Sequence, residues 1–443
     1  MKVKQFEYKP LAHYSYAIVS NGKMAVIDPE RNPLKYYSYA KEHNAVIVAV
    51  IQTHPHADFV SSHFQIHQET GATIYNSKLL GADYPHLTFD DGDEITLGDT
   101  LLKAINTPGH SPDSITIVAT ENSEVALFTG DTLFIGDVGR PDLREKAGNM
   151  SAKRQQLAEM MFHTIQHKFS DLPDSALIYP AHGAGSLCGK NLSSDNSSTL
   201  GQERKFNWAF KETSKEKFVN TLLDSQPFIP SYFGYNVAIN KAGAENIRIA
   251  KAAVHFSMNA IEKAMVVDVR SEENFKRGHL KGSINIQATS ENSKFETWLG
   301  AIIKPEESFS LVIEHPADLE VMLERVAKIG YEKQLKSIIT LVNENLVKSE
   351  KLNLNDFEQH PENYTIVDIR SESEINEGKF FESSLAQPLN ELRDTVKNIP
   401  IHKPIVVHCA GGYRSAAGSS IIERVVKNQK VYDLSDHIHD FKS

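Results

Sequence analysis

Histidine and aspartate side chains follow four short apolar segments in the first part of the chain. The six groups are His54, His56 and Asp58, then His110, Asp131 and His182. Side chains at alternate positions of an extended chain point to the same side, so loops at one edge of a sheet can bring these groups into one pocket. Imidazoles and carboxylates gathered in this way predict a metal site.

A second set of reactive groups lies near the end of the chain. The apolar segment 405–407 leads into His408-Cys409-Ala-Gly-Gly-Tyr-Arg414, and a helix-like segment follows. A cysteine between a buried strand and the start of a helix lies in a cradle of backbone N–H groups, and glycines let the loop curl tightly. That cradle and Arg414 stabilise a thiolate. The pattern predicts Cys409 as a nucleophile that can carry a persulfide sulfur.

Strands and turns alternate over the first 190 residues and position the metal-binding groups. We expect strands at 45–51, 95–105, 115–119, 125–128 and 177–179. A helical segment is expected at about 202–225. Residues 226–243 mix prolines, aromatic residues and glycines, which is typical of a linker, and place a domain boundary near residue 245.

An internal repeat fills the remainder of the chain. Met265-Val-Val-Asp-Val-Arg-Ser-Glu-Glu recurs as Thr365-Ile-Val-Asp-Ile-Arg-Ser-Glu-Ser, and strands alternate with helices in each copy. This alternation predicts two parallel α/β domains. When Val312 is aligned with Val406, the first copy has His315 and Glu320 in place of the cysteine and the arginine. The first copy is therefore expected to be catalytically inactive.

Composition limits the classes of function. The chain has 443 residues, enough for about three domains, and its net charge of -10 disfavours a nucleic-acid partner. No apolar run approaches the ~20 residues that span a bilayer, and the N-terminus lacks an apolar signal core. Two cysteines are too few for a disulfide framework. We expect a cytoplasmic protein with no membrane or nucleic-acid partner.

The motifs resemble two known families. His-X-His-X-Asp, Pro-Gly-His, Gly-Asp-Thr and Pro-Ala-His are similar to the metallo-β-lactamase superfamily, and the Cys409 loop resembles the active-site loop of rhodaneses. The resemblance implies a multidomain α/β protein, in which a metallo-β-lactamase αββα sandwich precedes two rhodanese-like α/β domains. The implied boundaries are 1–245 for the first domain, 246–345 for an inactive rhodanese homology domain and 346–443 for an active rhodanese domain.

Phe59 stands where the superfamily motif usually has a further histidine, which removes a ligand of a second metal. The remaining set resembles the persulfide dioxygenase branch, which implies one Fe(II) per chain in the N-terminal domain, held by His54, His110 and Asp131. The same resemblance implies roles for further residues. His56 and Asp58 would orient the ligands, His182 would be structural or handle a proton, and Arg140 would hold an anionic thiol. From its position six residues past His182, Cys188 is expected near the pocket mouth, where it would meet the persulfide.

As a whole the chain resembles bacterial persulfide dioxygenase–rhodanese fusions of sulfide detoxification. That likeness implies oxidation of a low-molecular-weight thiol persulfide by O2 to sulfite and thiol, followed by transfer of sulfane sulfur from Cys409 to sulfite, giving thiosulfate. The expected partners are the persulfide, O2 and sulfite, and we expect a homo-oligomer. The thiol carrier, whether glutathione, coenzyme A or bacillithiol, stays open.

Two alternatives remain. The first domain could be a zinc thioesterase of the glyoxalase II type, fused to a rhodanese sulfur-relay module. The rhodanese pair could also be a relay or thiol-sensing module that binds a partner protein and does not turn over.

Overall fold

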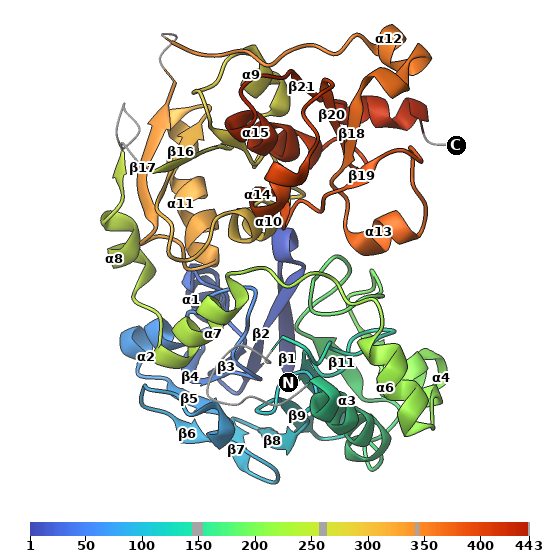
Figure 1. Cartoon of the computed structure of the whole chain (residues 1–443). Helices are drawn as coiled ribbons and strands as arrows, with labels where there is room; N and C mark the ends of the chain where they lie inside the picture. The colour runs from blue at the N-terminus through green and yellow to red at the C-terminus, as the bar shows by residue number, and fades with distance from the viewer. Residues whose placement is uncertain (144–153, 257–263, 342–344, 442–443) are drawn as a thin grey trace. The chain divides into compact units, whose positions relative to one another are not determined.

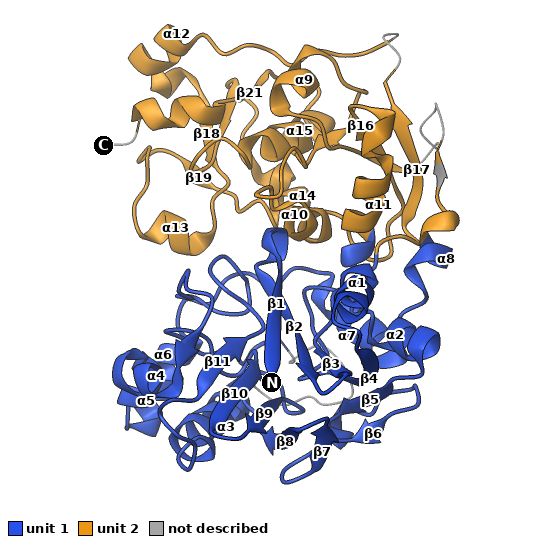
Figure 2. Ribbon diagram, turned by 180° about the vertical axis from the view of Figure 1, so that it is seen from behind, with its two compact units in different colours: residues 1–250, 327–330 blue, residues 251–326, 331–443 orange. Residues whose placement is uncertain are grey.

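A computed structural model of the chain describes residues 1–143, 154–256, 264–341 and 345–441. Figure 1 shows the elements in chain order, and Figure 2 shows the two compact units into which they group. Unit 1 comprises Met1–Ala250 with Ala327–Gly330, and unit 2 comprises Lys251–Val326 with Tyr331–Ser443. None of the helices in the described ranges has both the length and the apolar character that a bilayer crossing needs.

Unit 1 contains two six-stranded sheets. The strands of the first sheet, in spatial order, are β1 (Lys2–Tyr8), β2 (His13–Ser20), β3 (Lys23–Ile27), β4 (Val46–Ile51), β5 (Thr73–Asn76) and β6 (Leu87–Thr88). Those of the second sheet are β12 (Ser198–Thr199), β11 (Leu177–Pro180), β10 (Glu124–Gly130), β9 (Ile115–Glu121), β8 (Thr100–Asn106) and β7 (Glu94–Leu97). Strand pairing is mixed, parallel in β3–β6 and antiparallel in β7–β10.

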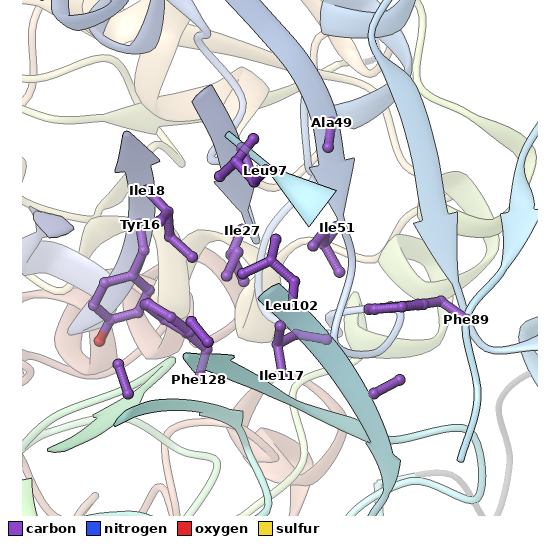
Figure 3. Close-up of a cluster of buried hydrophobic side chains, with 14 of the residues drawn as sticks. Tyr16, Ile18, Ile27, Ala49, Ile51, Phe89, Leu97, Leu102, Ile117 and Phe128 are labelled. Atoms are coloured by element: carbon purple, nitrogen blue, oxygen red, sulfur yellow. The ribbon is translucent and has the colours of Figure 1, made fainter. Parts of the chain in front are cut away.

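The two sheets face each other across an apolar core. Side chains of β2, β3 and β4 meet those of β8, β9 and β10 there, as Figure 3 shows for Ile18, Ile51, Leu102, Ile117 and Phe128. Alternation along each strand turns one set of side chains into this layer and the other set toward the helices. Burial of this apolar area is the main force that holds the sheets together.

Helices cover the outer face of each sheet. The outer helices are α1 (Leu34–Glu42) and α2 (His63–Thr70) on the first sheet, and α3 (Arg154–His163), α4 (Leu200–Phe206), α5 (Trp208–Lys211) and α6 (Lys215–Leu223) on the second. Tyr36 and Ile66 pack on the first sheet, and Ala158 and Phe218 on the second. The predicted αββα sandwich is thus confirmed.

Two predictions in this unit were wrong. The single strand expected at 95–105 is a hairpin of β7 and β8, because Gly98 takes a left-handed φ of +61° and reverses the chain. Residues 226–243 are not a linker, since they contain helix α7 (Phe233–Ala242). The prolines precede this helix and Gly243 follows it, while Phe233, Val237 and Asn240 are buried at helical spacing.

Unit 2 contains the two copies of the repeat, each built on a parallel sheet. The first copy has strands in the order β13 (His255–Phe256), β17 (Leu335–Thr340), β16 (Phe309–Ile313), β14 (Met265–Asp268) and β15 (Ile284–Asn285). The second has β19 (Leu385–Ala386), β18 (Thr365–Asp368), β20 (Ile405–His408) and β21 (Val431–Asp433). The predicted pair of rhodanese-like α/β folds is confirmed, whereas the exact boundaries at 245 and 345 stay predictions.

Helices connect the strands of each copy. Helix α8 (Ile247–Ala252) lies mostly in unit 1 and precedes the sheet of the first copy. The helices of the first copy are α9 (Glu272–Arg277), α10 (Phe295–Ile302) and α11 (Leu319–Lys328). Those of the second are α12 (Leu354–Gln359), α13 (Glu372–Asn376), α14 (Leu392–Thr395) and α15 (Ser415–Val425). In each copy the strand that ends in Asp-X-Arg leads into a helix capped by serine, at Ser271 and at Ser371.

Candidate metal centre and sulfur-transfer loop

Three of the predicted ligands meet in one place in unit 1. His54 follows β4, His110 follows β8 and Asp131 follows β10, and one donor atom of each lies within 4.8 Å of the others. Nε2 of His54 is 3.7 Å, and Nε2 of His110 3.6 Å, from Oδ2 of Asp131. All three side chains are buried. The strand ends therefore deliver two imidazoles and a carboxylate to a common point.

Hydrogen bonds fix which imidazole nitrogen faces that point. Nδ1 of His110 lies 2.8 Å from the carbonyl oxygen of Arg140, which can only accept, so Nδ1 donates. Nδ1 of His54 lies 3.0 Å from the hydroxyl of Thr53, and this hydroxyl donates its own proton to Asp28 at 2.7 Å. Both rings are thereby held as the tautomer with the proton on Nδ1, which leaves the Nε2 lone pair toward Asp131.

The surroundings of Asp131 fit a bound cation. Its Oδ1 accepts a hydrogen bond from His182 at 2.7 Å, while its Oδ2 is buried and has no hydrogen-bond partner among the described residues. A buried acceptor without a partner is costly. Burial alone would raise the pKa of Asp131, but His182 and then His54 and His110 hold this pKa well below its usual range. A divalent metal ion bound through Nε2, Nε2 and Oδ2 fits this donor set.

His182 lies between two carboxylates. Its Nδ1 faces Asp131 and its Nε2 hydrogen bonds to Asp58 at 2.9 Å. Burial disfavours the charged ring, yet Asp131 and Asp58 raise the pKa of His182 well above its usual value. Asp58, predicted to orient a ligand, therefore acts on His182. His56, also predicted to orient ligands, lies 3.0 Å from Asp28 through its Nε2.

Phe59 places an apolar ring beside these groups. The ring is fully buried, and its centroid lies 3.9 Å from that of His13 and 4.4 Å from that of His56. A phenyl ring offers no donor atom to a metal. The packing agrees with the interpretation that Phe59 removes a ligand from the second metal position.

Arg140 has its guanidinium engaged inside the protein. Its Nε and Nη2 each donate to Asp142 at 2.6 Å, and its Nη1 donates to the carbonyl of Leu187. Its own carbonyl holds His110, and an added Cβ on the preceding Gly139 would lie 1.8 Å from the carbonyl oxygen of Asp131. In the structure Arg140 thus positions a ligand, and its predicted contact with an anionic substrate stays a prediction.

Cys188 lies deeper than expected. It was predicted at the pocket mouth, but it is 1% exposed, and its sulfur is within 4.8 Å of donor atoms of Asp58 and His182. Burial, and then the charges of Asp131 and Asp58, raise the pKa of this thiol well above its usual value. These surroundings favour the thiol over the thiolate, and the predicted role of Cys188 in meeting the substrate stays a prediction.

Two residues that support the site were missed from the sequence. Asp28 follows β3 directly and accepts from the backbone and hydroxyl of Thr53, a position that a strand-end search could have found. Asn240 of α7 donates from its amide to the carbonyls of His56 and Phe59, both at 2.8 Å. No local pattern marks Asn240, because its partners lie far away in the sequence.

Cys409 lies between β20 and α15, as predicted. Its sulfur accepts a hydrogen bond from the backbone N–H of Gly412 at 3.2 Å, and the hydroxyl of Ser415 closes the loop on the carbonyl of Gly412. Both nitrogens at the end of Arg414 donate to Glu374 at 2.6 Å. Burial opposes the charge of Glu374, but Arg414 lowers the pKa of Glu374 to about 2. The loop therefore presents two groups to the thiol. One is the backbone N–H of Gly412, and the other is the guanidinium of Arg414, which is held by its ion pair with Glu374.

The alignment of the two copies proposed from the sequence was wrong by two positions. Asp268 pairs with Val312 in the first copy, as Asp368 pairs with His408 in the second. This register places Ile313 where Cys409 stands, and Asp318, directly before α11, where Arg414 stands. The apolar run of the first strand could be shifted without changing its hydrophobic pattern, which is why the sequence did not fix it.

The conclusion about the first copy is unaffected by this correction. Its strand ends in an isoleucine, the position of the arginine carries an aspartate, and Asn274 replaces Glu374 after the capping serine. The first copy therefore has no thiol, cation or carboxylate at the positions of Cys409, Arg414 and Glu374, respectively.

Comparison with known proteins agrees with this architecture. The model of the metallo-beta-lactamase superfamily matches residues 8–182, and that of the rhodanese-like domain matches residues 255–320 and 353–443. The chain is 33% identical over 143 residues to persulfide dioxygenase ETHE1, mitochondrial, of Homo sapiens, a match that covers 32% of this chain and 51% of that protein. It thus spans about half the length of this relative.

Two further relatives extend the comparison. A cytoplasmic hydroxyacylglutathione hydrolase of Arabidopsis thaliana is 31% identical over 176 residues, covering 38% of this chain and 63% of that protein. A crystal structure of a metallo-beta-lactamase from Staphylococcus aureus subsp. aureus COL superimposes with a TM-score of 0.70 at 32% identity, covering 77% of this chain and 99% of that one. The chain therefore belongs to the metallo-β-lactamase superfamily and carries rhodanese-like domains after its metallo-β-lactamase domain.

Proposed function

We propose that the protein is a persulfide dioxygenase coupled to a thiosulfate-forming sulfurtransferase. A thiol persulfide is oxidised in unit 1 to sulfite and thiol, and Cys409 in unit 2 transfers a sulfane sulfur to sulfite. The observation that carries the proposal is the meeting of His54, His110 and Asp131 at one point. The likeness to persulfide dioxygenase ETHE1 and to rhodaneses supports both halves.

His54, His110 and Asp131 would hold a single ferrous ion. Two neutral imidazoles and one carboxylate with open positions are the facial set of non-haem iron oxygenases. Ferrous iron, once bound, would supply the redox chemistry by which O2 oxidises the terminal sulfur of the persulfide. Atoms balance when O2 and a water molecule supply the oxygen atoms of sulfite and the carrier leaves as the thiol.

The residues around the ligands have defined tasks in this proposal. Thr53 and the carbonyl of Arg140 keep the two imidazoles in the metal-binding tautomer. His182, hydrogen-bonded to Asp58 through Nε2, holds a proton that can be given to the departing thiolate. Phe59 keeps the adjacent position apolar and so disfavours a second metal ion.

Sulfur transfer is assigned to the Cys409 loop. The Cys409 thiolate attacks the sulfane sulfur of a second persulfide molecule, and the bond between that sulfur and the carrier breaks, so the carrier leaves as thiolate with the electron pair. Sulfite then attacks the outer sulfur on Cys409, releasing thiosulfate and restoring the thiolate. The N–H of Gly412 and the positive charge of Arg414 favour the anionic sulfur in both steps.

Oxygen consumption tests the dioxygenase half. Protein loaded with Fe(II) under anaerobic conditions is mixed with glutathione persulfide and O2, and the uptake of O2 is followed together with sulfite and thiosulfate. We expect uptake with thiosulfate as the main product. Absence of uptake with persulfides of glutathione, coenzyme A and bacillithiol would refute the dioxygenase assignment.

A zinc thioesterase is the second candidate for unit 1. His182 lies between Asp131 and Asp58, and the chain is also similar to a hydroxyacylglutathione hydrolase over 176 residues. This alternative expects zinc-loaded protein to hydrolyse a thiol ester of glutathione without O2. The two candidates therefore differ in both metal and co-substrate.

A further inference from the structure

The first rhodanese-like copy, residues 264–341, carries no sulfur chemistry of its own but touches the loop that does. Within unit 2 it contacts the segment between Cys409 and Arg414 at Tyr413 and, through one intermediate residue, at Gly412. The two contacts start from different segments of the second copy, one from Tyr413 and the other from Ser435. They raise the question of what the first copy contributes to the Cys409 site.

The first contact is a reciprocal pair between Tyr413 and Gln287. The hydroxyl of Tyr413 donates to the carbonyl of Gln287 at 2.8 Å, and the side-chain amide of Gln287 donates to the carbonyl of Tyr413 at 3.4 Å. Gln287 is only 9% exposed and Tyr413 is partly exposed, so these bonds are partly buried.

The second contact reaches the loop through Ser435. An added Cβ on Gly412 would lie 2.8 Å from the backbone nitrogen of Asp436, so the loop packs directly on this segment. The hydroxyl of Ser435 donates to the carboxylate of Glu272 at 2.7 Å. Glu272 in turn donates its backbone N–H to Oε1 of Gln287 at 3.0 Å.

The contacts close into a ring. Starting from Gln287, it runs through Glu272 and Ser435 to Gly412 and returns through Tyr413. The side chain of Gln287 makes two of these bonds, because its amide nitrogen donates to Tyr413 and its amide oxygen accepts from Glu272. The same loop supplies the N–H of Gly412 that contacts the Cys409 sulfur.

Arg325 fixes the segment of the first copy that follows Gln287. Arg325 forms a buried ion pair with Glu296, at 2.7 and 2.9 Å, and donates to the carbonyls of Ala288, Ser290 and Ser293. These carbonyls belong to the segment that directly follows Gln287. A guanidinium that satisfies several carbonyls at once fixes the backbone between them.

We propose that Gln287 is a positioning residue for Cys409, so that the inactive copy supplies part of the frame of the sulfur-transfer site. The inference rests on the proposed role of Cys409 as the sulfur-transfer nucleophile. Without Gln287, Tyr413 and Gly412 can move, and the Gly412 N–H no longer lies at a fixed distance from the sulfur. The loop would then stabilise the anionic sulfur less well.

The test compares Gln287→Ala with Glu307→Gln in the full-length protein. Glu307 pairs with Arg393 and joins the two copies elsewhere, so its variant controls for a loosened contact between copies. Thiosulfate formation from glutathione persulfide and sulfite is measured without O2, and the rate of Cys409 alkylation by iodoacetamide is followed against pH. Gln287→Ala should lower kcat roughly threefold to tenfold, the worth of one hydrogen bond, and shift the alkylation profile to higher pH. Glu307→Gln should match the wild type.

Tyr413→Phe provides a second variant that removes one hydroxyl and keeps the ring. It should shift the alkylation profile in the same direction as Gln287→Ala. Wild-type rates and an unshifted profile in both variants would overturn the positioning role, whereas a wild-type protein that forms no thiosulfate would refute the role of Cys409 instead. Because alkylation does not depend on turnover, its pH profile tests the positioning in either case.

Discussion

Thr53 and Asp28 show how single side chains prepare the metal site. Neither is a ligand, yet the Thr53 hydroxyl stands between His54 and the buried carboxylate of Asp28. An added Cβ on Gly130 would lie 2.5 Å from this hydroxyl, so the loop before Asp131 packs against the same group. Ligand orientation therefore depends on contacts that the ligand motif does not contain.

Thr53→Val should weaken iron binding by roughly tenfold to a hundredfold, because His54 loses the acceptor that fixes its tautomer. The measurement is the iron retained per chain against a competing chelator. Thr88→Val, at an exposed position of β6, serves as the control and should bind as the wild type does. Equal iron retention in Thr53→Val and Thr88→Val would contradict the orienting role of Thr53.

Phe59 is the residue that sets the expected metal count. Phe59→His would add an imidazole donor next to Asp58 in the sequence, against the rings of His13 and His56, so the metal bound per chain in excess Zn(II) should rise from about one to about two. Metal analysis after gel filtration measures this ratio. Phe206→His, which adds a histidine at a side chain that is 65% exposed, should leave the ratio unchanged. An unchanged ratio in Phe59→His would mean that Phe59 does not control the second position.

At the scale of secondary-structure elements, the residues of both candidate sites lie in loops that directly follow strands. The loops after β4, β8, β10 and β11 hold the metal-site groups, and the loop after β20 holds Cys409. These positions could be predicted because apolar strands and the short motifs behind them are local patterns. Helix α7 could not be predicted, since its prolines and aromatic residues obscure a buried face that only the fold reveals.

The repeat marks a different limit of sequence reasoning. Loss of the nucleophile in the first copy could be predicted from residue types alone, but not which residue replaces it. Hydrophobic patterns of adjacent registers look alike in a fully buried strand, and all five residues of β16 are buried. Backbone pairing with β14 resolved the choice in favour of Ile313.

Helix α7 makes a stability prediction. Asn240→Ala removes the donors to the carbonyls of His56 and Phe59 and the acceptor for the backbone of Ser61. Because these buried groups would lose their partners, we expect unit 1 to lose about 2–3 kcal/mol in free energy of unfolding. Urea denaturation measures the loss. Asn220→Ala, at an exposed position of α6, should cost under about 1 kcal/mol, and an equally small cost for Asn240→Ala would contradict the bracing role.

The ion pair between α13 and the Cys409 loop makes a pH prediction. Arg414 lowers the pKa of Glu374 to about 2, below its ordinary value of 4.5. The ionised Glu374 therefore stabilises the folded state fully above pH 4.5, and this contribution is lost as the pH falls toward 2. Glu374→Gln should therefore lower the free energy of unfolding by about 1 kcal/mol at pH 7. Urea denaturation at pH 7 and at about pH 3 should show this difference shrinking at the lower pH. A difference that is independent of pH would exclude a charge-based contribution.

At the scale of the whole molecule, the proposed function joins an oxidation to a transfer that consumes the product of the oxidation. Unit 1 presents the candidate metal centre, and unit 2 presents one rhodanese-like copy that carries Cys409 and one that has no cysteine. In the proposed function sulfite links the two reactions, because it leaves the first and accepts sulfur in the second. Self-association of the chain stays a prediction that sedimentation velocity can test.

The measurement that tests the coupling most directly is the product balance of Cys409→Ser. Iron-loaded wild-type and variant proteins are given glutathione persulfide, and O2 uptake, sulfite and thiosulfate are quantified together. The account predicts equal O2 uptake, with thiosulfate from the wild type and accumulating sulfite from the variant. Undiminished thiosulfate from Cys409→Ser would contradict the account, as would loss of O2 uptake in a variant that keeps its iron.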